Sequence, residues 1–237
     1  MRKSSRGAVD PFIVMDVMEA ARKAEEAGHT VIHMEVGQPS TPAPNGALEA
    51  VSKVLSNDPM GYTVALGIPE LRARIAALYD SWYGLDLDPA RVVVTSGSSG
   101  AFLLTFSALF ENGDRVGIGA PGYPSYRQIL KALGYAPVVI QADAYHGYQL
   151  TPKDIVGQNL QGLMMASPAN PTGTMLSRDD MSAIIHAAKS DGVSFISDEI
   201  YHGIEFGKKA VSALEVSDDG YVINSFSKYF SMTGWRL

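Results

Sequence analysis

Residues 162–198 read GLMMASPANPTGTMLSRDDMSAIIHAAKSDGVSFISD, and the fold is decided by this stretch. It begins and ends with short apolar runs, Gly162–Ala166 and Val193–Ser197, which predict two buried strands. Between them, residues Ser177–Ser190 are apolar at helical spacing and open with a serine and an aspartate three residues apart, a typical helix start. A strand, a helix and a second strand in this order predict two parallel strands joined by a crossover helix.

The same alternation extends through most of the chain. Six strands are predicted, at Arg91–Thr95, Arg115–Gly119, Ala136–Gln141, Gly162–Ala166, Val193–Ser197 and Tyr221–Ser225, with helices near Gly100–Phe110, Ser125–Leu133 and Ser177–Ser190 between them. The strands are near-continuous apolar runs, which is typical of strands covered by helices on both faces. We therefore predict an α/β fold with a doubly wound, mostly parallel sheet.

Further helices are predicted before this sheet. The first covers Phe12–Ala27, with Asp10 as its N-cap and Pro11 at its first position, and the others cover Ala47–Leu55 and Pro69–Tyr83. Between the first two, residues Gly37–Pro44 are rich in glycine, proline, serine and threonine, which indicates an irregular crossing segment or a hinge.

The composition excludes several classes of protein. Apolar residues make up 46% of the chain and charged residues 19%, which is typical of a globular protein rather than a disordered one. A net charge of −6 disfavours a nucleic-acid partner. The absence of cysteine excludes a disulfide framework, a thiolate zinc site and a cysteine nucleophile. No apolar run is long enough for a membrane helix, and Asp10 and Asp16 argue against a signal peptide, so a cytoplasmic protein is expected.

Ligands of open parallel sheets bind beyond the carboxyl ends of the strands, so the residues that follow each strand are the candidate site residues. After the first strand, the small residues of Thr95–Gly100 lead into a helix, which fits either a phosphate-binding loop or an ordinary turn. After the fourth strand, Pro171 restricts Asn170 to an extended conformation, which by itself is a feature of turns.

The last two strands are followed by ionisable side chains. Asp198 follows a buried strand, where a carboxylate requires a cation or hydrogen-bond donors. For Glu199, the next residue, an ordinary surface ion pair is expected. Lys228 lies among serines and aromatic residues after the sixth strand, so it is either a solvated lysine or one of lowered pKa that is suited to imine chemistry.

Two other patterns carry less weight. Residues Gly117–Gly122 spell G-x-G-x-x-G, with Asp143 about twenty residues further on, as in dinucleotide-binding proteins. Gly117 lies inside a predicted strand rather than after it, so an NAD-binding module is the weaker alternative. The five histidines are scattered, and although Asp198 and His202 are four residues apart, two ligands do not make a metal site, so none is predicted.

Taken in order, these segments resemble the fold-type I pyridoxal-phosphate (PLP) aminotransferases of class I/II. The resemblance covers nearly the whole chain and rests on Gly37-Gln38-Pro39, Gly61-Tyr62-Thr63, Gly97-Ser98-Ser99, Pro121-Gly122-Tyr123, Asn170-Pro171-Thr172-Gly173, Ser197-Asp198-Glu199-Ile200-Tyr201, Ser225-Phe226-Ser227-Lys228 and Gly234-Trp235-Arg236. Each motif is moderately specific, and the ordered set is strong.

The resemblance implies a role for each candidate residue. Lys228 would form the Schiff base with PLP and then move protons, while Asp198 would pair with the protonated pyridine nitrogen. Asn170 and Tyr201 would bond the 3-oxygen of the ring. Tyr123 would stack on the ring, and Gly37 and Asn170 would position the substrate. The phosphate would be bound by Ser98, Ser99, Ser225 and Arg236. Tyr62 would contact the phosphate of a neighbouring subunit, which implies a homodimer.

The activity implied is transfer of an amino group between an amino acid and a 2-oxo acid. A PLP-dependent lyase and a ligand-sensing regulator of the same fold are the alternatives. The family continues well beyond this lysine, with the arginine that binds the substrate carboxylate and an antiparallel strand between the first and sixth strands. By this resemblance, residues 1–38 are an arm and part of a small domain, and residues 39–237 an incomplete large domain that we expect to be inactive alone.

Overall fold

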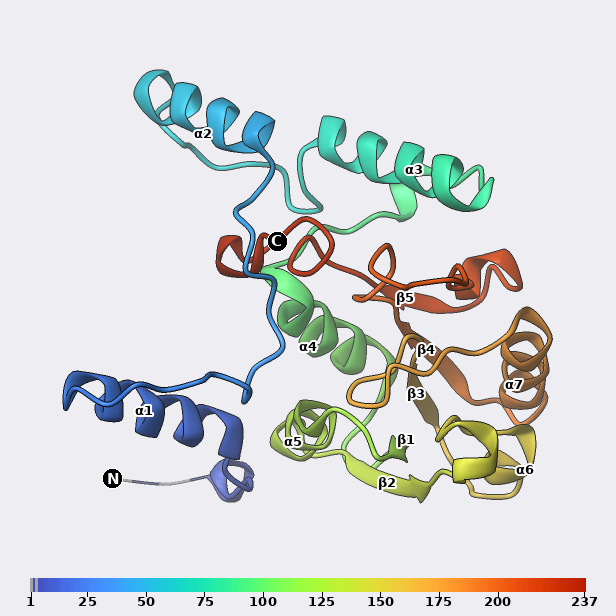
Figure 1. Cartoon of the computed structure of the whole chain (residues 1–237). Coiled ribbons are helices and arrows are strands. Elements are labelled where there is room, and N and C mark those ends of the chain that lie inside the picture. The colour runs from blue at the N-terminus through green and yellow to red at the C-terminus, as the bar shows by residue number, and fades with distance from the viewer. Residues whose placement is uncertain (1, 3) are drawn as a thin grey trace.

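The computed structural model describes residues 2 and 4–237, and in these residues a five-stranded parallel sheet lies at the centre of the molecule (Figure 1). The strands are β1 (Arg115–Ala120), β2 (Ala136–Gln141), β3 (Gly162–Ala166), β4 (Ser194–Asp198) and β5 (Tyr221–Ile223). Their order across the sheet is β2-β1-β3-β4-β5, and every neighbouring pair is parallel.

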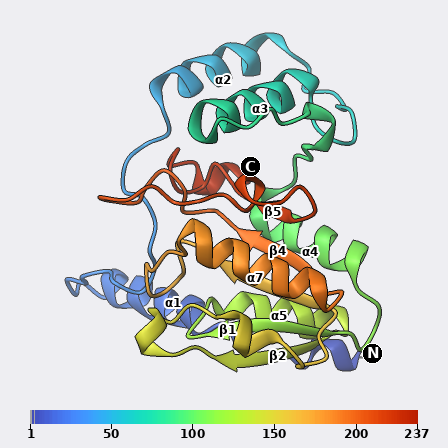
Figure 2. The same ribbon diagram turned by 90° about the vertical axis from the view of Figure 1, so that its right-hand side faces the viewer.

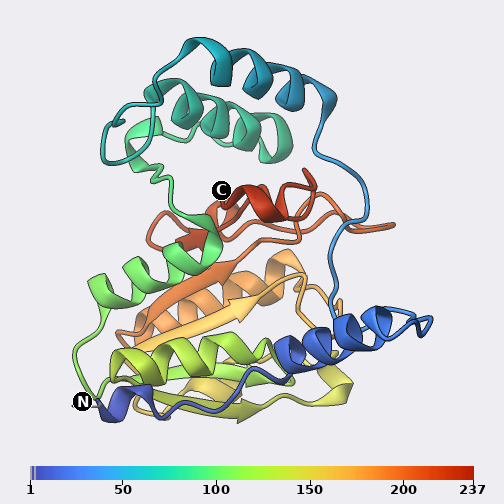
Figure 3. The same ribbon diagram turned by 90° about the vertical axis from the view of Figure 1, so that its left-hand side faces the viewer.

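Helices cover both faces of this sheet, which confirms the predicted α/β class. The longer helices are α1 (Ile13–Glu26), α2 (Asn45–Asn57), α3 (Pro69–Tyr83), α4 (Gly97–Leu109), α5 (Pro124–Leu133) and α7 (Arg178–Ser190), and α6 (Pro152–Ile155) is a single short turn. Helix α7 lies across one face in Figure 2, and α4 and α5 lie across the other in Figure 3. Helices α2 and α3 both lie beyond the β5 edge of the sheet (Figures 1 and 2).

The apolar core has two halves, one on each side of the sheet. Leu163 and Met165 of β3 belong to the cluster under α7, together with Ile184. Met164 of the same strand belongs to the cluster under α4 and α5, together with Phe106. Because successive side chains of a strand point to opposite faces, a strand buried on both faces must be apolar at every position.

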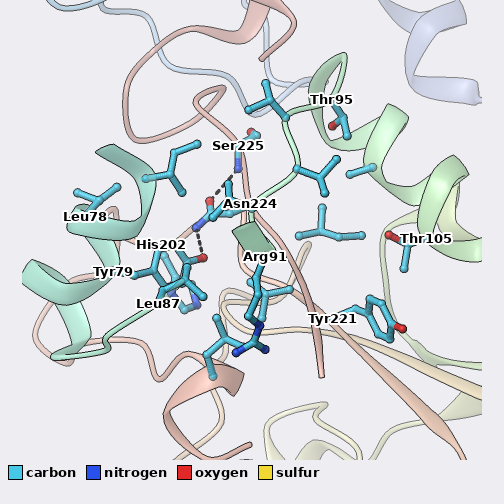
Figure 4. A pocket seen from close by; sticks show the side chains of 18 of the residues that line it. Leu78, Tyr79, Leu87, Arg91, Thr95, Thr105, His202, Tyr221, Asn224 and Ser225 are labelled. Atoms are coloured by element: carbon cyan, nitrogen blue, oxygen red, sulfur yellow. Dashed lines mark hydrogen bonds between the residues drawn. The ribbon is translucent and has the colours of Figure 1, made fainter. Parts of the chain in front are cut away.

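The predicted strand Arg91–Thr95 is wrong. Arg91 ends a short 3-10 helix, and the following residues are extended without joining the sheet; Val94 donates one backbone hydrogen bond, to the carbonyl of Leu66 at 3.0 Å. Residues 92–95 and the residues of β5 instead line opposite parts of a groove of about 720 Å³ (Figure 4). The segment has strand-like residues but no neighbouring strand among the described residues, so no hydrogen-bond ladder forms.

The predicted start of the first helix is also wrong, because Asp10 is not its N-cap. Helix α1 begins at Ile13, and the carboxylate of Asp10 pairs instead with Lys131 of α5 at 3.3 Å. Gln128, also of α5, donates its side-chain amide to the carbonyl oxygens of Asp10 and Pro11. The segment before α1 is therefore tied to α5 by polar contacts that a local helix signal cannot reveal.

No helix in residues 2 and 4–237 combines the length and the apolar character that crossing a membrane requires.

Two strand glycines provide a test of how tightly the sheet is packed. A Cβ atom at Gly162 would lie 2.1 Å from the buried ring of Phe110, whereas one at Gly119 would be in ordinary contact with Leu150 at 3.6 Å. We expect Gly162→Ala to lower the free energy of unfolding by about 1–3 kcal/mol, as overpacked cores do, and Gly119→Ala to change it by less than about 1 kcal/mol. Chemical denaturation measures both, and equal effects would contradict this packing.

Candidate active site

The carboxyl ends of the parallel strands meet along one edge of the sheet. The strand order reverses at β1, because the chain goes from β1 to β2 on one side and then to β3 on the other. Ligands of doubly wound sheets bind beyond such a reversal point. Tyr123, Asn170, Asp198 and Ser225 follow or end β1, β3, β4 and β5, so the topology brings these candidate residues to the same edge.

Asp198, the last residue of β4, is a buried carboxylate with its hydrogen bonds in place. Its side chain is 3% exposed; Oδ1 accepts from the backbone N–H of Ile200 at 3.0 Å, and Oδ2 accepts from the hydroxyl of Tyr126. Burial raises the pKa of Asp198 from 3.8 to about 6, although these two hydrogen bonds oppose the shift. A cation placed here would stabilise the ionised carboxylate.

Tyr126 is a site residue that the sequence analysis missed. It lies in the first turn of α5, is 6% exposed and packs edge-on against Tyr123, with the ring centres 5.3 Å apart. Burial and the neighbouring Asp198 raise the pKa of its hydroxyl well above the usual value, so the group remains a hydrogen-bond donor. The available signal was the three-residue spacing from Tyr123, which places both rings on one side of the helix.

Lys228 lies in the loop after β5 and is half-buried. Its Nζ donates to the carbonyl of Gly37 at 2.7 Å and lies 5.6 Å from the centre of the Tyr201 ring. Burial lowers the pKa of this lysine, while the charge of Asp198 acts in the opposite direction. A larger fraction of neutral amine makes Lys228 a better nucleophile than a solvated lysine.

Asn170 and Tyr201 are brought together from different loops. The side-chain amide of Asn170 donates to the hydroxyl of Tyr201 at 3.2 Å, and burial raises the pKa of that hydroxyl. The loop that carries Asn170 is held by the buried Gln149, whose amide donates to the carbonyls of Ala166 at 3.2 Å and Thr174 at 3.0 Å. The amide of Asn170 and the hydroxyl of Tyr201 are thus fixed side by side, and the ring of Tyr201 lies next to the Lys228 amine.

The start of α4 lies against the side chain of Arg236. Gly97 has φ +69°, and a Cβ there would lie 2.2 Å from Nη2 of Arg236. Ser98 and Ser99 follow in the first turn, and no side chain caps this end of the helix, so its N–H groups are available to a ligand. Uncapped N–H groups beside a guanidinium form an anion-binding arrangement.

Two sequence features lie apart from this arrangement. Tyr62 is fully exposed in the loop between α2 and α3, so its predicted contact with a neighbouring subunit stays a prediction. Gly117 lies inside β1, where a Cβ would come within 2.8 Å of Leu160, so this glycine serves the packing of the sheet. The G-x-G-x-x-G pattern is therefore not a loop that follows a strand, as dinucleotide binding requires.

Glu199 differs most from its expected environment. A surface ion pair was expected, but the side chain is 0% exposed and is enclosed by residues from distant parts of the chain. That expectation was wrong because the segment that covers Glu199, at Ser212 and Ala213, is 13 and 14 residues away in sequence, too far for a local pattern to reveal the contact.

Comparison with known proteins identifies the family of this chain. The description "Aminotransferase class I and II" belongs to the family profile that matches residues 29–237. The chain belongs to this family. A valine–pyruvate aminotransferase of Mycobacterium tuberculosis is 43% identical over 240 residues, and an aspartate aminotransferase of Geobacillus stearothermophilus is 32% identical over 238 residues. The alignments cover 100% and 97% of this chain but only 62% and 61% of those relatives.

Solved structures of this family have the same fold. A crystal structure of an aminotransferase from Mycobacterium tuberculosis superposes with a TM-score of 0.95 at 44% identity, over 100% of this chain and 62% of that one. The aspartate aminotransferase of Thermus thermophilus, solved with maleate, superposes with a TM-score of 0.93 at 27% identity, over 100% of this chain and 63% of that one. The chain thus spans about three fifths of the length of these relatives.

Replacement of Asp198 by asparagine tests the cost of the buried charge. Because folding raises the pKa of Asp198 to about 6, the ionised carboxylate destabilises the folded state above pH 6 and costs nothing below pH 3.8, where it is protonated in both states. We expect Asp198→Asn to stabilise the cofactor-free protein, relative to wild type, by on the order of 3 kcal/mol more at pH 8 than at pH 4. Urea denaturation at both pH values measures this, and a pH-independent difference would contradict it.

Proposed function

We propose that the full-length protein is a PLP-dependent aminotransferase that moves an amino group between an amino acid and a 2-oxo acid. The observation that carries the proposal is that a buried carboxylate, Asp198, and a half-buried lysine on which its charge acts, Lys228, come from neighbouring strands at one edge of the sheet. Family membership and the aminotransferase relatives support it.

The donor groups of the site fit PLP, a flat cationic ring with a phosphate at one end. The phosphate would bind where Arg236 meets the first turn of α4, which contains Ser98 and Ser99, and Ser225 of the loop after β5 would add a third hydroxyl. The carboxylate of Asp198 is suited to the protonated ring nitrogen, since a cation there offsets the burial of the charge. Tyr123 would pack on the ring.

PLP, when bound, supplies an acceptor for the electrons that leave the substrate α-carbon. Asp198 would hold the protonated ring nitrogen by its negative charge, and the hydroxyl of Tyr126, which donates to Oδ2, fixes that carboxylate in place. Asn170 and Tyr201 are suited to holding the 3-oxygen of the ring, since each offers a donor at that edge. Lys228 is the amine that holds the cofactor and, at Nζ, takes up and returns the proton of the substrate.

Substrate and partner assignments belong to the same proposal. The backbone at Gly37, which receives the hydrogen bond of Lys228, and the amide of Asn170 would help to position the substrate carboxylate. A homodimer is proposed, in which the exposed ring of Tyr62 reaches the phosphate of the neighbouring subunit. The valine–pyruvate aminotransferase relative makes valine and pyruvate the first substrate pair to test.

Amino transfer by the full-length protein is the direct test. With PLP, valine and pyruvate, we expect alanine to form together with the 2-oxo acid of valine, and Lys228→Ala to remove at least about 99% of the rate because the amine is essential. Chromatography of the products measures both. Failure with every amino donor offered, or release of ammonia and pyruvate from a β-substituted donor instead, would overturn the proposal, the second result in favour of a lyase.

The proposed phosphate site is tested by a matched pair of glycines. Gly97 and Gly192 have nearly the same backbone angle, φ +69° and +70°, but only Gly97 lies against Arg236, whereas the space at Gly192 is open. Both changes to alanine strain the backbone by about 1 kcal/mol. We expect only Gly97→Ala to weaken PLP binding, by about tenfold or more, because it displaces the guanidinium. Equal affinities of the two variants in an absorbance titration would rule this phosphate site out.

A further inference from the structure

Asp198 and Glu199 are consecutive carboxylates, and both are buried, with exposures of 3% and 0%. Asp198 bonds to Tyr126 of α5, while Glu199 bonds to the segment at Ser212 and Ala213. Two ionised carboxylates this close in a low-dielectric region repel each other, and one tends to take up a proton. Only Asp198 belongs to the proposed cofactor site.

The carboxylate of Glu199 is satisfied on one oxygen only. Its Oε1 accepts from the N–H of Ala213 at 2.7 Å and from the hydroxyls of Ser212 at 3.1 Å and Ser197 at 3.2 Å. Its Oε2 is buried and has no hydrogen-bond partner among the described residues. The nearest basic group is Nδ1 of His202, 3.7 Å from Oε2. An isolated charge in such a place is costly unless another charge compensates it.

The contacts of the His202 ring are compatible with both a neutral and a charged imidazole. It is 1% exposed, and its Nε2 lies 2.8 Å from the carbonyl of Ser167, which can only accept, so Nε2 carries a hydrogen. Its Nδ1 lies 2.5 Å from the hydroxyl of Tyr83, which can donate to a neutral ring or accept from a charged one. In residues 2 and 4–237, His202 is the only fully buried side chain that can carry positive charge.

We propose that His202 balances the charge of the buried Glu199 and thereby leaves the negative charge of the site on Asp198. This role rests on the proposed PLP-dependent function, in which Asp198 must be ionised. In the described residues the ring of His202 bonds to Tyr83 and Ser167 and lies beside Glu199, so it influences Asp198 by its charge and is a positioning residue. Glu199 and His202 together form the charge-balancing pair.

The electrostatics of Asp198 agree with this role. After burial, which is the main cause, the charge of Glu199 contributes to raising the pKa of Asp198, and the charge of His202 contributes to lowering it. Burial likewise raises the pKa of Glu199, and His202 is the main opposing influence. The pair therefore acts on Asp198 through two contributions of opposite sign.

The other titratable groups around the pair are neutral, negatively charged or exposed. Tyr79 and Tyr83 of α3 stay neutral, because burial raises their pKa values far beyond the usual range; Figure 4 shows Tyr79 beside Asn224, which donates to its hydroxyl at 3.3 Å. The carboxylate of Glu205 accepts from two backbone N–H groups, and that of Glu215 pairs with Arg178. Lys209 is exposed and lies 4.8 Å from the centre of the Tyr83 ring. The hydroxyl of Tyr79 also faces Glu199, whose charge contributes to raising the Tyr79 pKa, but a neutral hydroxyl supplies no positive charge. Among the described residues, His202 is therefore the buried group that can balance Glu199.

The test uses the full-length protein and three variants, His202→Gln, Glu199→Gln and the double variant. Glutamine at position 202 can donate to the carbonyl of Ser167, and glutamine at 199 keeps an oxygen for the three donors on Oε1. At pH 5, below the pKa of Asp198, we expect His202→Gln to weaken PLP binding about tenfold, Glu199→Gln to change it less than about twofold, and the double variant to bind within about threefold of wild type.

A second readout needs no cofactor. The pH dependence of unfolding, compared with and without Asp198→Asn in each background, reports the apparent pKa of Asp198. It should rise by about one unit in His202→Gln, fall or stay constant in Glu199→Gln and return towards wild type in the double variant. Absence of PLP binding by the wild type would refute the proposed function, and this readout would still decide the role of the pair.

Two results would overturn the role. One is an Asp198 pKa that is unchanged in His202→Gln. The other is an Asp198 pKa that rises in the double variant by as much as in His202→Gln, or by more. That result would indicate a merely structural role, in which the effects of the two substitutions add.

Discussion

The buried carboxyl group of Asp198 is the constraint on which the site depends. A carboxylate at the end of a fully covered strand lacks water, so its charge must be compensated by hydrogen bonds and by a cation. The hydroxyl of Tyr126 and the N–H of Ile200 supply the hydrogen bonds, yet the pKa of Asp198 remains at about 6. The folded chain therefore holds a group whose charged form is costly until a cationic ligand binds.

The parallel sheet explains why the other site residues converge on this carboxylate. Their loops leave one edge of the sheet, since every strand runs in the same direction. Hydrogen bonds from side chains to the backbone then fix the loops. The amide of Gln149 holds the loop of Asn170, and the hydroxyl of Thr233 donates to the carbonyl of Ser227, the residue before Lys228, at 2.8 Å. The resulting site holds its polar groups in place before a ligand binds, which reduces the cost of binding.

The order of strands and helices could be predicted from the sequence because strands buried on both faces and their crossover helices leave local patterns, as in residues 162–198. The strand at Arg91–Thr95 was predicted wrongly, because pairing depends on a neighbour and a local pattern cannot show one. Asp198 and Lys228 could be singled out by their positions after strands. The spacing of Tyr126 from Tyr123 was a local signal, but the hydrogen bond of Tyr126 to Asp198 and the burial of Glu199 could not be predicted, because both depend on contacts between distant segments.

In the proposed function, Lys228 is the amine that holds PLP, and the charged Asp198 lies at the same site. Borohydride reduction of the full-length protein incubated with PLP, followed by proteolysis and mass spectrometry, tests it most directly, because reduction makes the link permanent. We expect the added mass of the reduced cofactor to lie on the peptide that contains Lys228. Labelling of a different lysine, such as the exposed Lys208 or Lys209, or no labelling at all, would contradict it.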